Sequence, residues 1–127
     1  MSIMRQADCG VFPSRAEGWN LELLEMMAIG KHVITTNYSA HTEFCNSENS
    51  KLIDIDNVET AFDGVFFDGS GGMWAEISDK QKQQTIEHMQ SIHSAKQNNE
   101  LQVNTAGVAT GEKFSWKNSA QELINGL

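Results

Sequence analysis

The chain has 127 residues, of which 39% are hydrophobic and 20% charged, and this suits one soluble globular domain with little room for a second. Nine basic and seventeen acidic residues give a net charge of −8, which argues against nucleic acid or an anionic membrane surface as a partner. No apolar run approaches the roughly 20 residues of a membrane span, and the N-terminus lacks the shape of a signal peptide, so a cytoplasmic location is predicted.

The first half of the chain alternates between strand and helix patterns. Short apolar or β-branched runs predict strands, and these lie at residues 9–13, 31–36 and 51–55. Helical patterns lie at residues 3–7, 20–29 and 41–45. Asn20 is placed to cap the second of these helices with its side chain, and Gly30 supplies a left-handed stop after it. Alternation of this kind indicates parallel strands joined by crossover helices.

The second half departs from this alternation. Residues 63–74 are rich in glycine and aromatic side chains, which predicts an irregular excursion or a small hairpin. Phe66, Phe67 and Trp74 in this segment have two interpretations, ordinary core or an apolar patch at an interface. Ser78 and Gln81 have the spacing of a capping box at the start of a helix. The helices predicted for this half lie at residues 78–96, 101–112 and 117–125.

The fold class predicted from this order is α/β, a partial Rossmann-like parallel sheet with flanking helices. A parallel sheet is normally covered on both faces, yet only about three strands are predicted here. Residues 1–127 are therefore expected to be one segment of a larger domain. Cys9 and Cys45 lack a C-x-x-C spacing and are predicted to be reduced residues that pack in the interior.

Two glutamates flank the predicted start of the helix at residue 20. Glu17 precedes the helix and Glu25 lies one turn inside it, at the edge of the sheet where open α/β proteins bind ligands. We expect both carboxylates to look into a common crevice, with Glu25 accepting hydrogen bonds from vicinal hydroxyl groups such as those of a ribose. Free N–H groups at the helix start, backed by the helix dipole, would cradle a phosphate or a sugar hydroxyl without a basic side chain. The residues expected to provide them are Gly18, Trp19, Asn20 and Leu21.

The same helix has a simpler interpretation. Glu22 and Glu25 are three residues apart and would form one polar stripe on an amphipathic helix, without any role in binding. Spacing alone does not choose between the stripe and a binding role, so both interpretations stay open.

Residues 7–44, ADCGVFPSRAEGWNLELLEMMAIGKHVITTNYSAHTEF, resemble the donor-binding motif of the family 4 retaining glycosyltransferases, also called group 1. Members of that family carry a glutamate, seven residues and a second glutamate, preceded by a Pro-Ser turn and followed by an apolar helix that ends in Gly-Lys. The resemblance implies the two-domain GT-B fold, with residues 1–127 as the C-terminal segment of the nucleotide-sugar-binding domain. The acceptor-binding domain and the start of the donor-binding domain are then expected to lie outside this sequence.

The resemblance also implies roles for the residues already named. Glu17 matches the first motif glutamate, which in the family contacts the donor sugar and is discussed as a catalytic stabiliser, and Glu25 matches the second, which holds the ribose. The turn whose N–H groups meet the sugar and the diphosphate is matched by Gly18, Trp19, Asn20 and Leu21. Asn20 departs from the pattern because a second glycine is common there, although asparagine also tolerates a left-handed backbone.

No metal and no cofactor are implied, because the family is generally metal-independent. Asp54 and Asp56 form a D-x-D at the end of a predicted strand, without the flanking sequence that would support a metal-bound diphosphate. Arg15, beside Glu17, is interpreted as a structural ion pair or a solvated side chain rather than a phosphate ligand. In the family an Arg and a Lys that hold the diphosphate come from a region that this sequence does not contain.

The reaction that the resemblance implies is transfer of a sugar from a nucleotide-diphosphate donor to an acceptor, with retention of configuration. Two alternatives stay open: a non-catalytic binding module that keeps half of a donor site, and a structural protein that covers its exposed sheet with another copy of itself. The expected partners are a nucleotide sugar and either the missing N-terminal half or a second copy. The chain alone is not expected to catalyse the transfer.

Overall fold

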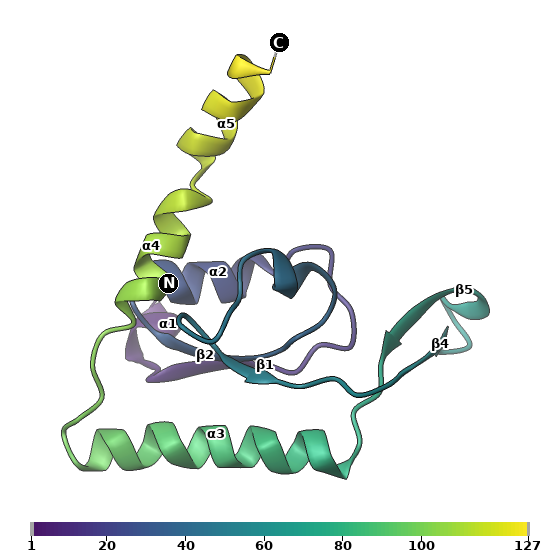
Figure 1. Ribbon diagram of the computed structural model, residues 1–127, viewed down its shortest axis with the longest axis horizontal. Helices are drawn as coiled ribbons and strands as arrows, with labels where there is room; N and C mark the ends of the chain where they lie inside the picture. Colours follow the sequence, from purple (N-terminus) through teal and green to yellow (C-terminus); the bar gives the residue numbers. More distant parts are fainter. Residues whose placement is uncertain (1, 127) are drawn as a thin grey trace.

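The computed structural model describes residues 2–126 and shows a three-layered α/β arrangement (Figure 1). The central sheet is parallel and has the order β1-β2-β3, with β1 at Cys9–Phe12, β2 at His32–Thr36 and β3 at Lys51–Ile53. Helices α2 (Leu21–Ala28) and α4 (Thr105–Lys113) lie on one side of the sheet, and α3 (Asp79–Gln97) runs along the other (Figure 1). The predicted fold class, a partial Rossmann-like parallel sheet with flanking helices, is confirmed.

Apolar side chains fill the space on both faces of the sheet. On the face covered by α3, the buried side chains of Ile34, Ile53 and Ile92 pack together. On the face covered by α2, the buried cluster consists of Leu23, Leu24, Met26, Met27, Val33, Phe44 and Cys45. The neighbours Val33 and Ile34 thus serve opposite faces, as successive residues of a strand must. Because both faces are covered, β2 is apolar or β-branched over nearly its whole length.

Helix α2 follows from local signals in the sequence. Asn20 has a left-handed backbone (φ 73°), and its side-chain oxygen accepts a hydrogen bond from the Leu23 N–H at 3.2 Å, as a helix cap does. Gly30, also left-handed (φ 75°), follows the end of the helix as predicted. A Cβ built on Gly111 of α4 would come within 2.7 Å of the Ala28 Cα. Helix α4 therefore packs closely on α2 and fixes its position over the sheet.

Several boundaries differ from the predictions. The helix predicted at 41–45 is a 3₁₀ helix, η1, at Ser39–Glu43. The helix predicted at 101–112 is α4, which begins later because the Asn104 side chain accepts from the Gly107 N–H at 2.9 Å and caps it there. The strand predicted at 9–13 as buried is only half-buried, since β1 lies at one edge of the sheet. The remaining predicted helices are α1 at Ser2–Gln6 and α5 at Trp116–Asn125.

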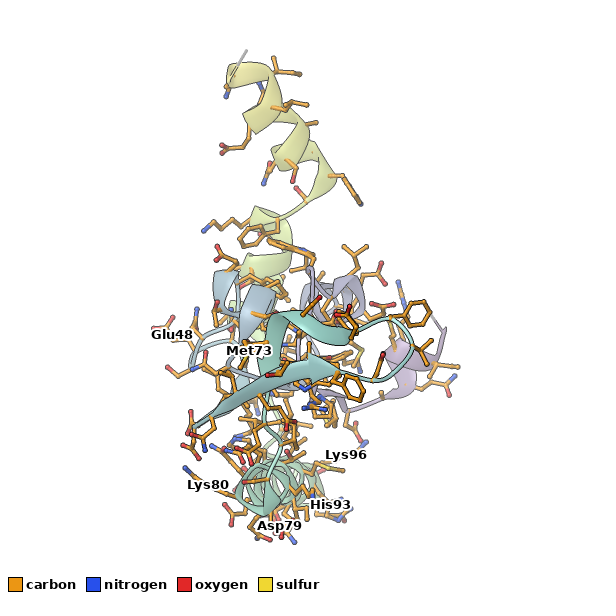
Figure 2. The ribbon with its side chains drawn as sticks, turned by 90° about the vertical axis from the view of Figure 1, so that its right-hand side faces the viewer. Glu48, Met73, Asp79, Lys80, His93 and Lys96 are labelled. Atoms are coloured by element: carbon orange, nitrogen blue, oxygen red, sulfur yellow. The ribbon has the colours of Figure 1, made fainter. Side chains whose placement is uncertain are left out.

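The glycine- and aromatic-rich segment forms an antiparallel hairpin of β4 (Val58–Phe62) and β5 (Asp68–Ala75), which extends beyond the sheet (Figure 1). In Figure 2 this hairpin, with Met73 labelled, lies between α5 above and α3 below. Ordinary core is the wrong interpretation for Phe66 and Phe67, whose side chains are 88% and 48% exposed. A two-stranded ribbon has too little of the protein against it to bury both of its faces.

Helix α5 continues away from the rest of the chain, and none of its residues is buried (Figures 1 and 2). Within residues 2–126 no helix has the length and apolar character needed to cross a bilayer. Both cysteines are free: Cys9 is half-buried and Cys45 is buried in the α2 face of the core. Burial raises the pKa of the Cys45 thiol to about 11, so this sulfur behaves as a packing atom.

Candidate functional site

Polar side chains gather at the edge of the sheet where β1 and β2 end. Parallel strands present their carboxyl ends at the same edge, and in open α/β sheets ligands bind there. The loop after β1 leads into α2, and the loop after β2 leads into η1, so the two loops meet over this edge. The carboxyl-edge cluster, as we call it, consists of Ser14, Glu17, Asn20, Thr35, Thr36, Ser39 and His41.

Glu17 is held by its backbone and by one carboxylate oxygen. The Glu17 N–H donates to the Ser39 hydroxyl oxygen at 2.8 Å, and that hydroxyl donates back to the Glu17 carbonyl at 2.8 Å. The Ser14 hydroxyl donates to Glu17 Oε1 at 2.7 Å. Oε2 accepts no hydrogen bond from residues 2–126, and the side chain is half-buried. One oxygen of a fixed carboxylate therefore has no hydrogen-bond donor within residues 2–126.

The turn between Glu17 and α2 offers a row of unused backbone donors. The Leu23 N–H donates to the Asn20 side chain and completes the cap of the helix. The four backbone N–H groups from Gly18 to Leu21 donate to no acceptor within residues 2–126. Such groups at a helix N-terminus carry the positive end of the helix dipole and attract anions. The residues with these N–H groups are Gly18, Trp19, Asn20 and Leu21.

The Trp19 side chain serves the core rather than the solvent. Its ring lies 5.0 Å from the Phe44 ring and 5.4 Å from the Phe114 ring, centre to centre. This aromatic contact joins the turn, η1 and the end of α4 into one packed unit. The backbone of the turn is thereby anchored to the core through the Trp19 side chain.

Glu25 lies on the exposed face of α2, together with Leu21, Glu22 and Ala28. The amphipathic stripe considered for the two helix glutamates is therefore correct as a description of α2. Within residues 2–126 the Glu25 carboxylate has no hydrogen-bond or ion-pair partner. Glu25 thus lies about one helical turn beyond Leu21, and its carboxylate makes no hydrogen bond or ion pair with residues 2–126.

Arg15 connects the loop after β1 to the hairpin. Its Nε donates to the Ala75 carbonyl at 3.0 Å, its guanidinium lies 4.1 Å from the Trp74 ring centre, and it forms an ion pair with Glu59. The Ala75 N–H also donates to the Arg15 carbonyl at 2.7 Å. The interpretation of Arg15 as a structural ion pair is confirmed, and its charge is engaged by the protein.

The two aspartates of the D-x-D sequence are bound to α3. Both oxygens of Asp56 accept from Lys80 Nζ, at 2.8 and 2.7 Å, and these hydrogen bonds hold the pKa of Asp56 below its usual value. Asp54 accepts from the Gln84 side chain at 3.1 Å. Among residues 2–126 no group of three or more His, Cys, Asp or Glu side chains is arranged to hold a metal ion. The D-x-D therefore has a structural explanation.

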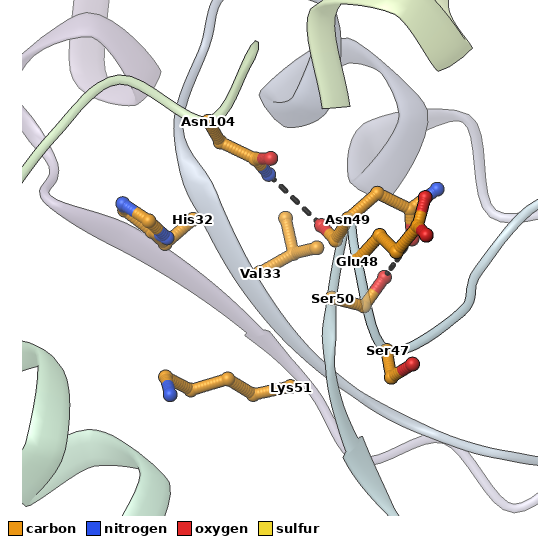
Figure 3. Close-up of a pocket in the computed structure, with 8 residues that line it drawn as sticks. All are labelled: His32, Val33, Ser47, Glu48, Asn49, Ser50, Lys51 and Asn104. Atoms are coloured by element: carbon orange, nitrogen blue, oxygen red, sulfur yellow. Dashed lines mark hydrogen bonds between the residues drawn. The ribbon is translucent and has the colours of Figure 1, made fainter. Parts of the chain in front are cut away.

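A cavity of about 220 Å³ lies at the opposite, amino-terminal edge of β2 and β3 (Figure 3). It is lined by the start of β2, by the loop before β3 and by Asn104. Asn104 donates to the Asn49 carbonyl at 2.9 Å and to the Lys31 carbonyl at 3.1 Å, so its polar side chain joins elements of the fold. None of the residues predicted to bind a donor lines this cavity.

The sequence reasoning did not single out Ser39, His41 or the two threonines at the end of β2. A signal for them exists, because Thr35, Thr36 and Asn37 place three polar residues where a buried strand reaches its carboxyl end. No sequence pattern predicts the hydrogen bond between Asn20 and His41, because the two residues are 21 positions apart.

The family of the chain is shown by its first half. The sequence model for the family described as Glycosyl transferases group 1 matches residues 1–65 of the 127. This region contains both glutamates, the turn between them and the whole carboxyl-edge cluster. No curated protein and no solved structure matches the chain. The chain therefore belongs to the group 1 glycosyltransferases.

Proposed function

We propose that the loop between β1 and α2 is the donor site of a family 4 type glycosyltransferase, which transfers a sugar from a nucleotide-diphosphate donor to an acceptor with retention of configuration. In this proposal residues 1–127 are a segment of the nucleotide-sugar-binding domain of a GT-B enzyme. The observation that carries the proposal is the row of unused N–H groups at Gly18–Leu21, beside the fixed carboxylate of Glu17, in a chain of this family.

The four N–H groups would receive the diphosphate and a sugar hydroxyl. Those of Asn20 and Leu21 lie at the positive end of α2, so charge that develops on the leaving diphosphate would be stabilised without rearrangement. A site of this kind needs no cluster of basic side chains, which agrees with the net charge of −8 and with the engagement of Arg15 by Glu59.

The two glutamates would have different tasks. Glu17, fixed by Ser14 and Ser39, would use its open oxygen to contact the donor sugar and stabilise the positive charge of an oxocarbenium-like transition state. Glu25, whose carboxylate has no protein partner within residues 2–126, would accept hydrogen bonds from the ribose hydroxyls. Binding of the nucleotide would then depend on Glu25, and the rate of transfer on Glu17.

Calorimetric titration of the full chain with UDP-glucose, GDP-mannose and ADP-glucose tests this proposal. We expect at least one donor to bind with a dissociation constant of about 1 mM or lower. Gly18→Leu should weaken this binding at least about tenfold. A Cβ at Gly18 meets no protein atom within 4 Å, so in our proposal the added side chain occupies space that the donor needs.

Gly71→Leu is the matched control, since a Cβ at Gly71 also meets no atom within 4 Å but lies on the hairpin. Neither glycine has a left-handed backbone, so both variants should keep the fold. Equal affinities of the two variants for the donor, or the absence of binding by any of the three donors to the unmodified chain, would contradict the proposal.

A further inference from the structure

His41 is the buried centre of the carboxyl-edge cluster. Its side chain is 1% exposed and lies between the end of β2 and the turn that begins α2. Nδ1 is 3.1 Å from the Thr36 carbonyl oxygen, 2.8 Å from the Thr35 hydroxyl and 3.3 Å from the Thr36 hydroxyl. Nε2 is 3.0 Å from Asn20 Nδ2. Both ring nitrogens therefore have close polar partners.

These partners determine where the imidazole carries its proton. The Thr36 carbonyl can only accept, and the two threonine hydroxyls donate elsewhere, to the Phe12 carbonyl at 3.3 Å and the Ser14 carbonyl at 2.6 Å. Three acceptors thus face Nδ1, which must carry the hydrogen. The Asn20 oxygen accepts from the Leu23 N–H, so its NH₂ group faces His41. Nε2 must then be the acceptor, and the ring is neutral.

Among the described residues, the charge found to act on the His41 ring is that of one carboxylate. Glu17, from the loop after β1, acts on the ring through its charge. The side chains in hydrogen-bond or ring contact with His41 are those of Thr35, Thr36, Asn20 and Phe44, all uncharged. Burial lowers the pKa of His41 and outweighs the opposite effects of the Thr36 carbonyl and of Glu17.

We propose that His41 is a positioning residue for the donor site, which as a neutral imidazole protonated on Nδ1 fixes the Asn20 amide and with it the turn from Glu17 to Leu21. A second proton, on Nε2, would face the NH₂ group of Asn20. An amide flip would relieve this contact but would turn the NH₂ group toward the Leu23 N–H and remove the cap of α2. The left-handed backbone of Asn20 would then lose the hydrogen bond that stabilises it.

The turn is therefore expected to rearrange on the acid side while the rest of the fold persists. That this weakens donor binding rests on the function proposed above, whereas the rearrangement itself does not. A buried histidine with only a structural role would change global stability with pH, but it would not move the turn selectively at a pH where β3 and α3 are intact.

Nitrogen-15 spectra of the full chain test the tautomer. At pH 7.5 we expect His41 to carry hydrogen on Nδ1. His32 and His88 provide an internal contrast, since their Nε2 atoms lie 2.7 and 2.9 Å from the carbonyls of Gln102 and Leu52 and must donate. A proton on Nε2 of His41 at pH 7.5 would overturn the proposal, and this measurement needs no variant.

Spectra of two variants, recorded between pH 7.5 and pH 5, test whether the protonation of His41 controls the turn from Glu17 to Leu21. His41→Gln supplies a neutral oxygen where Nε2 accepts from Asn20, so the backbone signals of Gly18–Leu21 should match the unmodified chain at pH 7.5 and stay constant on acidification. His41→Asn is too short to reach Asn20 and should displace these signals already at pH 7.5. In the unmodified chain they should shift with the titration of His41, ahead of signals from Ile53 and Ile92. A shift that persists in His41→Gln would assign the change to Glu17 or another group and overturn the proposal.

The consequence for binding is measured with UDP and GDP at pH 7.5 and 5.5. The unmodified chain should lose at least about twofold more affinity than His41→Gln between these two pH values, since the lowered pKa of His41 delays its protonation to the acid side. Equal losses would overturn the link between His41 and the donor. If neither nucleotide binds at pH 7.5, the proposed donor site fails, and the spectra alone decide whether His41 positions the turn.

Discussion

Glu25→Gln is expected to weaken nucleotide binding by roughly five- to thirtyfold, because a charge-assisted hydrogen bond exceeds a neutral one by about 1–2 kcal/mol. Glu17→Gln should change binding by less than about threefold but lower the rate of sugar transfer by about a hundredfold, since it removes charge that acts only in the transition state. Calorimetry with this chain measures the first effect. Release of nucleotide from the donor, in the two-domain GT-B enzyme of which we propose this chain to be a segment, measures the second.

Glu22→Gln is the matched control for this pair. It removes the same charge from the exposed face of α2, three residues before Glu25. A loss of affinity in Glu22→Gln equal to that in Glu25→Gln would reduce the effect to a general change of charge at the helix. Equal effects of Glu17→Gln and Glu25→Gln on both binding and rate would contradict the separate roles that we propose.

Leu23→Ala is expected to lower the free energy of unfolding by about 2–5 kcal/mol, which is a large part of the total for a small domain. The Leu23 side chain is 0% exposed and lies in the cluster that joins α2 to the sheet. Urea unfolding followed by circular dichroism gives the loss. The Leu23 N–H also donates to the Asn20 side chain that caps α2. The same helix turn therefore supports both the core and the candidate site.

Leu21→Ala provides the comparison for this stability effect. Leu21 is two positions earlier in α2, and its side chain is 50% exposed. We expect this variant to lose less than about 1 kcal/mol, as partly exposed side chains do. Similar losses in the two variants would mean that α2 does not carry the buried face described here.

The local parts of the fold were predictable because their causes are local. Asn20 can cap a helix and Gly30 can end one through interactions that span only a few residues, and both act as the sequence indicates. The alternation of β-branched runs with helical spacing likewise indicates a parallel sheet before any contact is known. Even the capping box of Ser78 and Gln81 is present at the start of α3.

The parts that could not be predicted depend on contacts between distant residues. The hydrogen bond between Asn20 and His41 exists only once β1 and β2 pair in register. The exposure of Phe66 could not be inferred from its apolar side chain, because it depends on how far the hairpin extends beyond the sheet. Glu25 shows the same limit, since its helix position predicts exposure but not what its carboxylate binds.

The measurement that tests the central claim most directly is a crystal structure of the chain with a bound nucleotide diphosphate. We predict diphosphate oxygens within about 2.7–3.2 Å of the N–H groups of Gly18–Leu21 and ribose hydroxyls on the Glu25 carboxylate. A nucleotide bound instead in the cavity beside Asn104, at the opposite edge of the sheet, would contradict the account.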